Sequence, residues 1–183
     1  MTLQPGNNPS EVYAYSYNPT GAHSGDTELP ICSWTVGGTQ VNYQAYLKFD
    51  YTLPAGATII SAKLSLHAMP NPHGGNNVDA HYGTANAFYI QRITAAWPPA
   101  TTTWNNQPST TMTNQITIPN SISATQDAID IDVTQLVKDM QQNGNYGFAM
   151  RLLTENYYNI RQYASSFNGD ATKRPKLEIQ YSN

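Results

Sequence analysis

The sequence is poor in charged residues and holds a single cysteine. Only 11% of its 183 residues are Asp, Glu, Lys or Arg, against about 25% in an average soluble domain, and Asn, Gln, Ser and Thr fill the surface positions instead. Because one cysteine cannot form an intrachain disulfide, stability has to come from packing. We expect Cys32 to be a small buried side chain and not a reactive thiol.

Two further absences exclude classes of partner. A net charge of -3 supplies no broad basic field, so nucleic acid is not an expected partner. No apolar run approaches the roughly 18 residues that a membrane span needs, so a membrane is not expected either. The start, MTLQPGNNPSEV, lacks the parts of a signal peptide, but the surface composition is typical of a secreted or cell-surface protein. We expect an extracellular domain whose export signal is absent from this chain.

Short runs of alternating apolar and polar residues predict β-strands along most of the chain. In ISAKLSLH, the alternation places Ile60, Ala62, Leu64 and Leu66 inward and Lys63 outward. Other strands are predicted at residues 12–17, 45–50, 88–93, 115–118, 146–153, 159–164 and 176–181. This gives at least eight strands.

One segment has a helical spacing instead. Apolar residues recur on one side of DVTQLVKDMQQNG, residues 132–144, where Asp132 or Thr134 can cap the first amides and Gly144 suits the end. The pattern predicts one short helix near residues 134–143. Many strands with one helix predict an all-β fold, a two-sheet antiparallel β-sandwich that is jelly-roll-like, forming a single domain over residues 1–183.

Four stretches resemble a known family when they are taken together and in order. They are YLKFDYTLPAGATIISAKLSLH (46–67), ITAAWPPATTTWNNQPS (93–109), IDVTQLVKDMQQNGNYGFAMRL (131–152) and YASSFNGDATKRPKLEIQY (163–181). The chain thereby resembles the DNRLRE-type domain, a β-sandwich family that overlaps the family-96 carbohydrate-binding modules. The resemblance implies a non-catalytic module of secreted or surface proteins, which in some members binds acidic polysaccharide such as alginate.

The two tryptophans of the second stretch have two interpretations. The resemblance treats Trp97 and Trp104 as part of the shared framework, so we expect both rings to pack as structural wedges while Asn105 and Asn106 tie the turn. The alternative is that Trp104 is an exposed platform for a sugar ring. If the tryptophans are structural, sugar stacking has to come from Trp34 or from tyrosines.

Candidate ligand-binding residues are aromatic or cationic. Tyr13, Tyr15 and Tyr17 alternate along one strand, either as a stacking ladder or as a tyrosine-lined core edge. The predicted ligand-binding residues are the exposed aromatics Tyr82, Tyr157 and Tyr158 and the cations Arg151, Arg161, Lys48 and Lys63. Arginine can hold a uronate carboxylate through two parallel N–H bonds, and we expect Lys48 and Lys63 to line one sheet face.

Metal binding has only a weak signal. The sequence identifies no cofactor with certainty. A structural calcium ion is the one metal that it leaves as an option, and no ligand set is defined for it. Candidate ligands are Asp26, Glu28, Asp79, Asp127, Asp130, Asp132 and Asp170. His73, Asp79 and His81 share one long loop, but they lack a recognised zinc spacing.

The sequence therefore predicts a non-catalytic polysaccharide-binding module of a larger secreted or surface protein, with neighbouring domains or identical subunits as further partners. An alternative is a structural or adhesive β-sandwich subunit of an extracellular filament or surface protein. A third interpretation is a polysaccharide lyase, in which tyrosine or histidine abstracts a proton while a cation neutralises the uronate. Its candidate residues are His67, His81, Tyr82 and Arg92.

Overall fold

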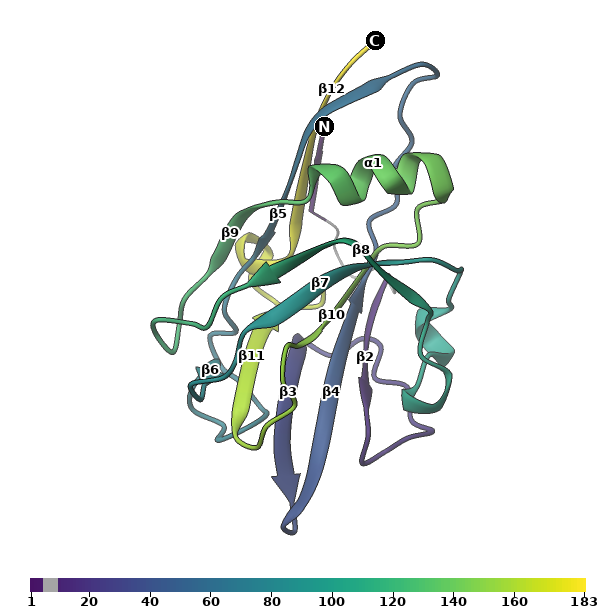
Figure 1. The fold of residues 1–183 in the computed structure, drawn as a ribbon. Helices are drawn as coiled ribbons and strands as arrows, with labels where there is room; N and C mark the ends of the chain where they lie inside the picture. Colours follow the sequence, from purple (N-terminus) through teal and green to yellow (C-terminus); the bar gives the residue numbers. More distant parts are fainter. Residues whose placement is uncertain (5–9) are drawn as a thin grey trace.

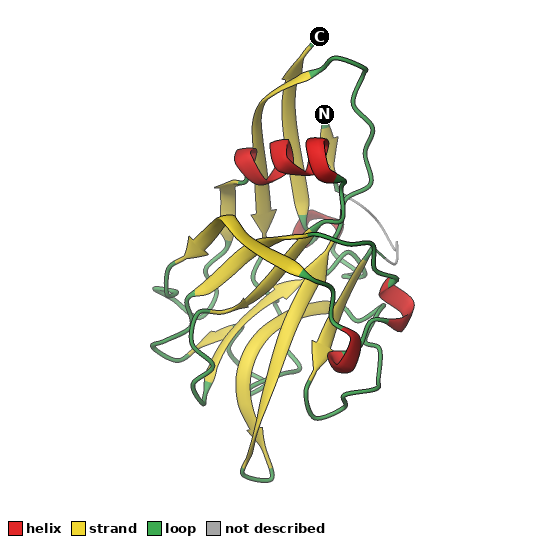
Figure 2. Ribbon diagram, turned by 45° about the vertical axis from the view of Figure 1, so that its right-hand side comes forward, coloured by secondary structure: helices red, strands yellow, loops and turns green. Residues whose placement is uncertain are grey.

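A computed structural model describes residues 1–4 and 10–183, and it shows two antiparallel sheets with one α-helix (Figures 1 and 2). The expected all-β sandwich is confirmed. The smaller sheet has the strand order β1 (Thr2–Leu3), β12 (Lys176–Ser182), β5 (Thr58–Leu66) and β9 (Ala128–Asp132). Among the described helices, none has the length and apolar character of a membrane span.

The larger sheet has eight strands, with the main path running through β4. Its order is β6 (His81–Tyr82), β11 (Asn159–Ala164), β3 (Glu28–Val36), β4 (Thr39–Leu47), β10 (Phe148–Leu152), β7 (Phe88–Ile93) and β8 (Thr110–Ile118), and β2 (Glu11–Tyr15) also pairs with β4. β4 pairs with β3 from Thr39 to Tyr43 and with β2 from Tyr43 to Leu47. Because Tyr43 pairs with Tyr15 of β2 and with Cys32 of β3, these two strands lie on opposite edges of β4, and β10 continues the edge of β3 from Ala45 onward.

The main core is formed by the inward residues of both sheets. Leu47 at the end of β4, Phe49 just after it, and Ala62, Leu64 and Leu66 on β5 are buried as their alternation predicted. Ile60 was predicted wrongly, because it is 59% exposed while its neighbour Ile59 is buried. The cause is a β-bulge: Tyr181 pairs with Ile59 and Gln180 with Ser61, so Ile60 is an extra residue on β5.

The single α-helix, α1 (Thr134–Asn143), covers one end of this core with Leu136, Val137 and Met140. The N-cap residue is Val133, which makes no side-chain capping bond, but the predicted contacts of Asp132 and Gly144 are both present. Asp132 accepts a hydrogen bond from the Thr134 amide at 2.9 Å, and Gly144 has a φ of +99° and donates its N–H to the Met140 carbonyl. The Thr134 hydroxyl instead accepts from the Ala62 amide, which attaches the helix to β5.

A second apolar cluster lies on the other face of β4 and contains the two framework tryptophans. Trp97 and Trp104 pack against Val12, Ala14 and Tyr46, and the Trp97 indole donates to the Tyr146 carbonyl at 2.7 Å. The wedge interpretation is therefore confirmed. Asn106 ties the turn by accepting from Thr103 and donating to the Thr101 carbonyl, whereas Asn105 contributes its backbone N–H to Pro19.

Glu11 is a buried carboxyl group at the start of β2. Its Oε1 accepts hydrogen bonds from the Ser166 amide and hydroxyl at 2.6 and 2.8 Å, while Oε2 is buried without a partner among the described residues. Desolvation raises the pKa of Glu11 from 4.5 to about 7. Folding therefore favours the protonated form, and the stability contributed by this group is lost as the pH rises from about 4.5 to 7.

We predict that Glu11→Gln stabilises the fold more at pH 8 than at pH 4.5. The change in the free energy of unfolding that the substitution causes should be larger at pH 8 by on the order of 1–3 kcal/mol. His81 acts in the opposite direction, because burial lowers its pKa to about 4 and the unfolded chain takes up a proton below about pH 6.5. His81 is present in both the wild type and the variant, so its contribution cancels when their free energies of unfolding are subtracted. The remaining difference is due to Glu11. Chemical denaturation between pH 4.5 and 8 measures it, and a difference independent of pH would contradict the prediction.

Candidate functional site

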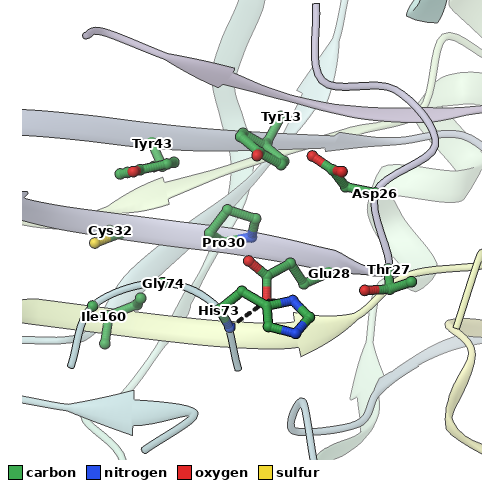
Figure 3. Close-up of a pocket in the computed structure, with 11 residues that line it drawn as sticks. Tyr13, Asp26, Thr27, Glu28, Pro30, Cys32, Tyr43, His73, Gly74 and Ile160 are labelled. Carbon is green, nitrogen blue, oxygen red and sulfur yellow. Dashed lines mark hydrogen bonds and ion pairs between the residues drawn. The ribbon is translucent and has the colours of Figure 1, made fainter. Parts of the chain in front are cut away.

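A cleft lies on the face of the large sheet where β2, β4, β3 and β11 stand side by side in that order (Figure 3). It has a volume of about 200 Å³, and its lining residues come from β2, β3, β4, β11, the segment just before β3 and the loop before β6. They are Tyr13, Asp26, Thr27, Glu28, Pro30, Cys32, Tyr43, His73, Gly74, Gly75 and Ile160. The cleft therefore crosses four neighbouring strands of the large sheet.

One row of side chains crosses five strands at this cleft. Directly paired residues of a sheet point to the same face, and pairing joins the row Tyr15, Tyr43, Cys32, Ile160 and Tyr82 in that order. At about 4.8 Å between strands, the row is roughly 19 Å long. Tyr43 is stacked on Tyr15 with ring centroids 4.1 Å apart, so one end of the row is a rigid aromatic wall.

A group of aromatic side chains, which we call the Trp34 surface, forms the other end of the row. It consists of Trp34, Tyr82, Tyr157 and Tyr158. Tyr82 and Tyr158 pack edge-on against Trp34, with centroids 5.7 and 5.0 Å from it, and Tyr157 lies 6.2 Å from Tyr158. The three tyrosines are 45–52% exposed. The structure thus brings together the three tyrosines that were predicted from sequence, around a tryptophan.

The loop of residues 73–75 covers the middle of the row. Gly75 has a φ of +64°, and a Cβ there would lie 3.2 Å from Ile160 and 3.8 Å from Trp34, so glycine permits the close approach. Glu28 anchors the loop by accepting from the His73 amide at 3.0 Å and from the Gln162 side chain. Burial raises the pKa of Glu28. Cys32 and Ile160 lie below this loop and are fully buried.

Arg161 was predicted as a carboxylate clamp, and the structure places it in the core instead. It is 1% exposed, it donates to the Pro119 carbonyl and the Tyr163 hydroxyl at 3.0 and 2.6 Å, and its guanidinium lies over the Phe88 ring. Alternation along β11 explains this position, because Ile160 and Gln162 point to the cleft side and Arg161 points between the sheets. A side chain held in the core cannot reach a surface polysaccharide.

The two predicted lysines do not share a sheet face. Lys48 follows β4 and lies 2.6 Å from Asp50, whereas Lys63 is on β5 in the other sheet, 3.9 Å from Asp130. The expectation that they line one face is therefore wrong, since outward parity in two different sheets is not a shared surface.

Arg151 is half-buried on β10, on the face that carries Tyr46 and not Tyr43. Its charge opposes part of the rise in the pKa of Tyr46 that burial causes. The structure therefore separates Arg151 from the Trp34 surface by placing the two on opposite faces of the sheet.

The lyase candidates are not assembled as a catalytic group. His81 is 3% exposed, and both ring nitrogens have backbone partners, the Gln126 carbonyl at 2.7 Å and the Gln162 amide at 3.3 Å. His67 pairs with Asp127 at 3.1 Å. Arg92 lies on β7, where it pairs with Phe148 and Thr111. Tyr82 alone belongs to the Trp34 surface.

The carboxylates that were considered as calcium ligands are distributed over the fold. Asp132 and Asp170 cap helical turns, and Asp79 accepts from Asn76. Within residues 1–4 and 10–183, no group of three or more His, Cys, Asp or Glu side chains is placed to hold a metal ion. A calcium site therefore stays a prediction without a ligand set.

Sequence reasoning missed several residues that shape the cleft. Tyr43, Gly75 and Ile160 were not proposed as site residues, and Trp34 was considered only as an alternative to the tyrosines. The hairpin that carries Trp34 could have been predicted from SWTVGGTQV, residues 33–41, because two glycines between alternating runs are a strong hairpin signature. Gly37 and Gly38 have φ values of +57° and +83° at the turn between β3 and β4, and this hairpin positions Trp34.

Comparison with known protein families identifies the family of this chain. A family model described as carbohydrate-binding module family 96 matches residues 11–181, which is nearly the whole chain. No curated protein is significantly similar to it.

Cys32 provides a chemical test of the covered cleft. It is 1% exposed, and burial raises the pKa of its thiol, so little thiolate is present and access is blocked. We predict that an aromatic disulfide reagent at pH 8 labels the native chain at least a hundredfold more slowly than the chain in denaturant. Absorbance of the released thiolate measures both rates, and equal rates would show that the loop of residues 73–75 does not cover the thiol.

Proposed function

We propose that the Trp34 surface holds a polysaccharide without reacting with it, and the premise is that the chain belongs to carbohydrate-binding module family 96. The observation that carries the proposal is the gathering of three half-exposed tyrosines around Trp34 at the end of a cross-strand row. Exposed aromatic groups of this kind on a soluble domain mark a binding surface.

The chemistry of the surface suits sugar rings. A pyranose ring presents C–H faces that pack on aromatic faces, and a phenol adds a hydrogen-bonding tip at a low cost in rotamer entropy. Trp34 is held edge-on by Tyr82 and Tyr158, so the rings are ordered before the ligand arrives. Such preorganisation reduces the entropy that binding has to offset.

The proposed role is passive retention in an extracellular setting. Binding at a small, open surface is weak for each site, and its effect is to raise the local concentration of an attached domain. The alternative, an adhesive subunit of a filament, would use the same exposed tyrosines to contact neighbouring protein. Analytical ultracentrifugation separates the two, since self-association that buries Trp34 would favour the filament.

An acidic polysaccharide such as alginate has one candidate contact among the predicted arginines. Arg151 is partly exposed, but it lies on the other face of the sheet from the Trp34 surface. Arg151 and Trp34 therefore define two places at which a glycan could bind, and a pair of variants distinguishes them.

We predict that Trp34→Ala weakens binding of the preferred glycan more than tenfold, which is about 1.4 kcal/mol, because the ring that supports both Tyr82 and Tyr158 is lost. Tyr158→Ala should have a similar effect on a smaller scale. Glycan arrays identify the ligand, and titration calorimetry measures the affinities.

Tyr89→Ala is the matched control, because Tyr89 is a partly exposed tyrosine that pairs with Arg151 on the other face. The affinity of the Tyr89→Ala variant for the glycan should equal that of the wild type. Loss of binding in Arg151→Ala with full binding in Trp34→Ala would move the site to the opposite face, and no glycan retained by any protein would refute the proposal.

A further inference from the structure

The nine cationic side chains all lie away from the cleft and the Trp34 surface. Arg161 points into the core, Arg92 and Arg151 lie on β7 and β10, Lys138 is on α1, and Lys63 and Lys176 are on the small sheet. Lys48 is paired with Asp50, Lys173 is near Asp127, and Arg174 donates to the Asn168 carbonyl. None of the eleven residues that line the cleft is Lys or Arg.

Carboxyl groups occupy this region instead. Asp26 and Glu28 line the cleft, Asp26 beside Tyr13 and Glu28 beside His73 (Figure 3). Glu155 reaches the β3–β4 hairpin, where its Oε2 accepts from Asn42 at 2.7 Å and its backbone carbonyl accepts from Gln40. Gln40 and Asn42 alternate with Val41, the cross-strand partner of Trp34, so their side chains and the Glu155 groups bonded to them lie on the face of the sheet opposite Trp34. Asp26 and Glu28 are therefore the carboxyl groups that border the aromatic row.

This arrangement has an electrostatic consequence for a bound chain. A uronic acid polymer carries one carboxylate on each ring, so stacking several rings along the row would bring carboxylates close to Asp26 and Glu28. Like charges repel at these separations, more strongly in a partly desolvated cleft than in water. Neutral hydroxyl groups meet no such penalty, and carboxylate oxygens accept hydrogen bonds from them.

We propose that the cleft and the Trp34 surface select an uncharged polysaccharide and reject uronic acid chains. The proposal rests on the proposed function, and it adds the charge of the ligand. The tyrosine and tryptophan rings can stack on any pyranose chain. The carboxyl groups make the cleft selective for neutral chains, because they repel chains that carry carboxylates.

The test compares two chains that differ only in charge. The β-1,4-linked mannose hexamer and the β-1,4-linked mannuronate hexamer have the same ring and linkage, with CH₂OH in one and a carboxylate in the other. The cellulose hexamer and its C6-oxidised counterpart form a second pair. Titration calorimetry at pH 7 and low salt should show at least tenfold tighter binding of the neutral member. This gap in affinity between the two members of a pair should narrow at 0.3 M salt, because salt screens the repulsion.

Charge variants assign the effect to named residues. Asp26→Asn should narrow the difference in affinity between the two members of a pair by tightening the binding of the charged member, because Asp26 lines the cleft and is partly exposed. Glu28→Gln tests the anchoring residue, with thermal unfolding as a check on its fold. Glu178→Gln is the control, since Glu178 lies on the small sheet beside Lys176, and its gap should equal that of the wild type.

Each outcome decides one of the two proposals. Equal binding of both members, or tighter binding of the uronate member, would overturn the charge inference and leave the proposed function standing. If neither pair binds, the charge of whichever glycan is retained on an array decides the inference. If no glycan is retained, the proposed function itself fails.

Discussion

A change of partner along one edge of β4 is the constraint on which the rest of the site depends. Up to Tyr43 this edge is paired with β3, and from Ala45 onward it is paired with β10, whereas β2 pairs with the opposite edge. Two strands cannot occupy the same edge, so β3 leaves β4 after Tyr43, and the cleft is lined by the part of β3 beyond this point, with Glu28 and Pro30, and by Tyr13 of β2. Tyr43 is the last residue of β4 that pairs with β3, and its ring stacks on Tyr15 across the other edge. The position of the cleft and of its aromatic wall thus follows from backbone hydrogen bonding.

Buried polar contacts keep β11 in place beside this cleft. A chain with few charges and no disulfide has to fix its strands by packing and hydrogen bonds, and the inner side of β11 does so with Arg161, whose guanidinium bonds Pro119 and Tyr163. On its outer side, Gln162 donates to Glu28, which also holds the His73 amide. Removing one partner of such a network leaves a buried polar group unpaired, at a cost of about 1–3 kcal/mol. The cleft is therefore preformed.

The sequence predicted the fold well wherever alternation was regular. The strands Phe88–Ile93 and Asn159–Ala164 have the predicted bounds, and α1 lies where apolar spacing and Gly144 placed it. β3 was missed because ELPICSWTV is nearly all buried at its start and contains a proline, so it has no period of two. The site residues were harder to predict from sequence. Alternation along β11 shows that Arg161 points to the face opposite Ile160 and Gln162, but which of the two faces is the core depends on how β11 pairs with β3. That pairing is set by residues more than a hundred positions away.

The arrangement of the ends of the molecule bears on how weak binding can be useful. The N- and C-termini lie together at the end that carries α1, whereas the β3–β4 hairpin lies at the opposite end (Figure 1). Trp34 precedes the hairpin turn by only two residues. A polypeptide joined at either terminus would thus extend away from the Trp34 surface and leave it accessible. When two such surfaces engage one polymer, the second contact is intramolecular, and its effective concentration can raise the overall avidity by about 10² or more. A site of a few half-exposed rings then needs only modest affinity, which agrees with rings that pack on each other more than they enclose a ligand.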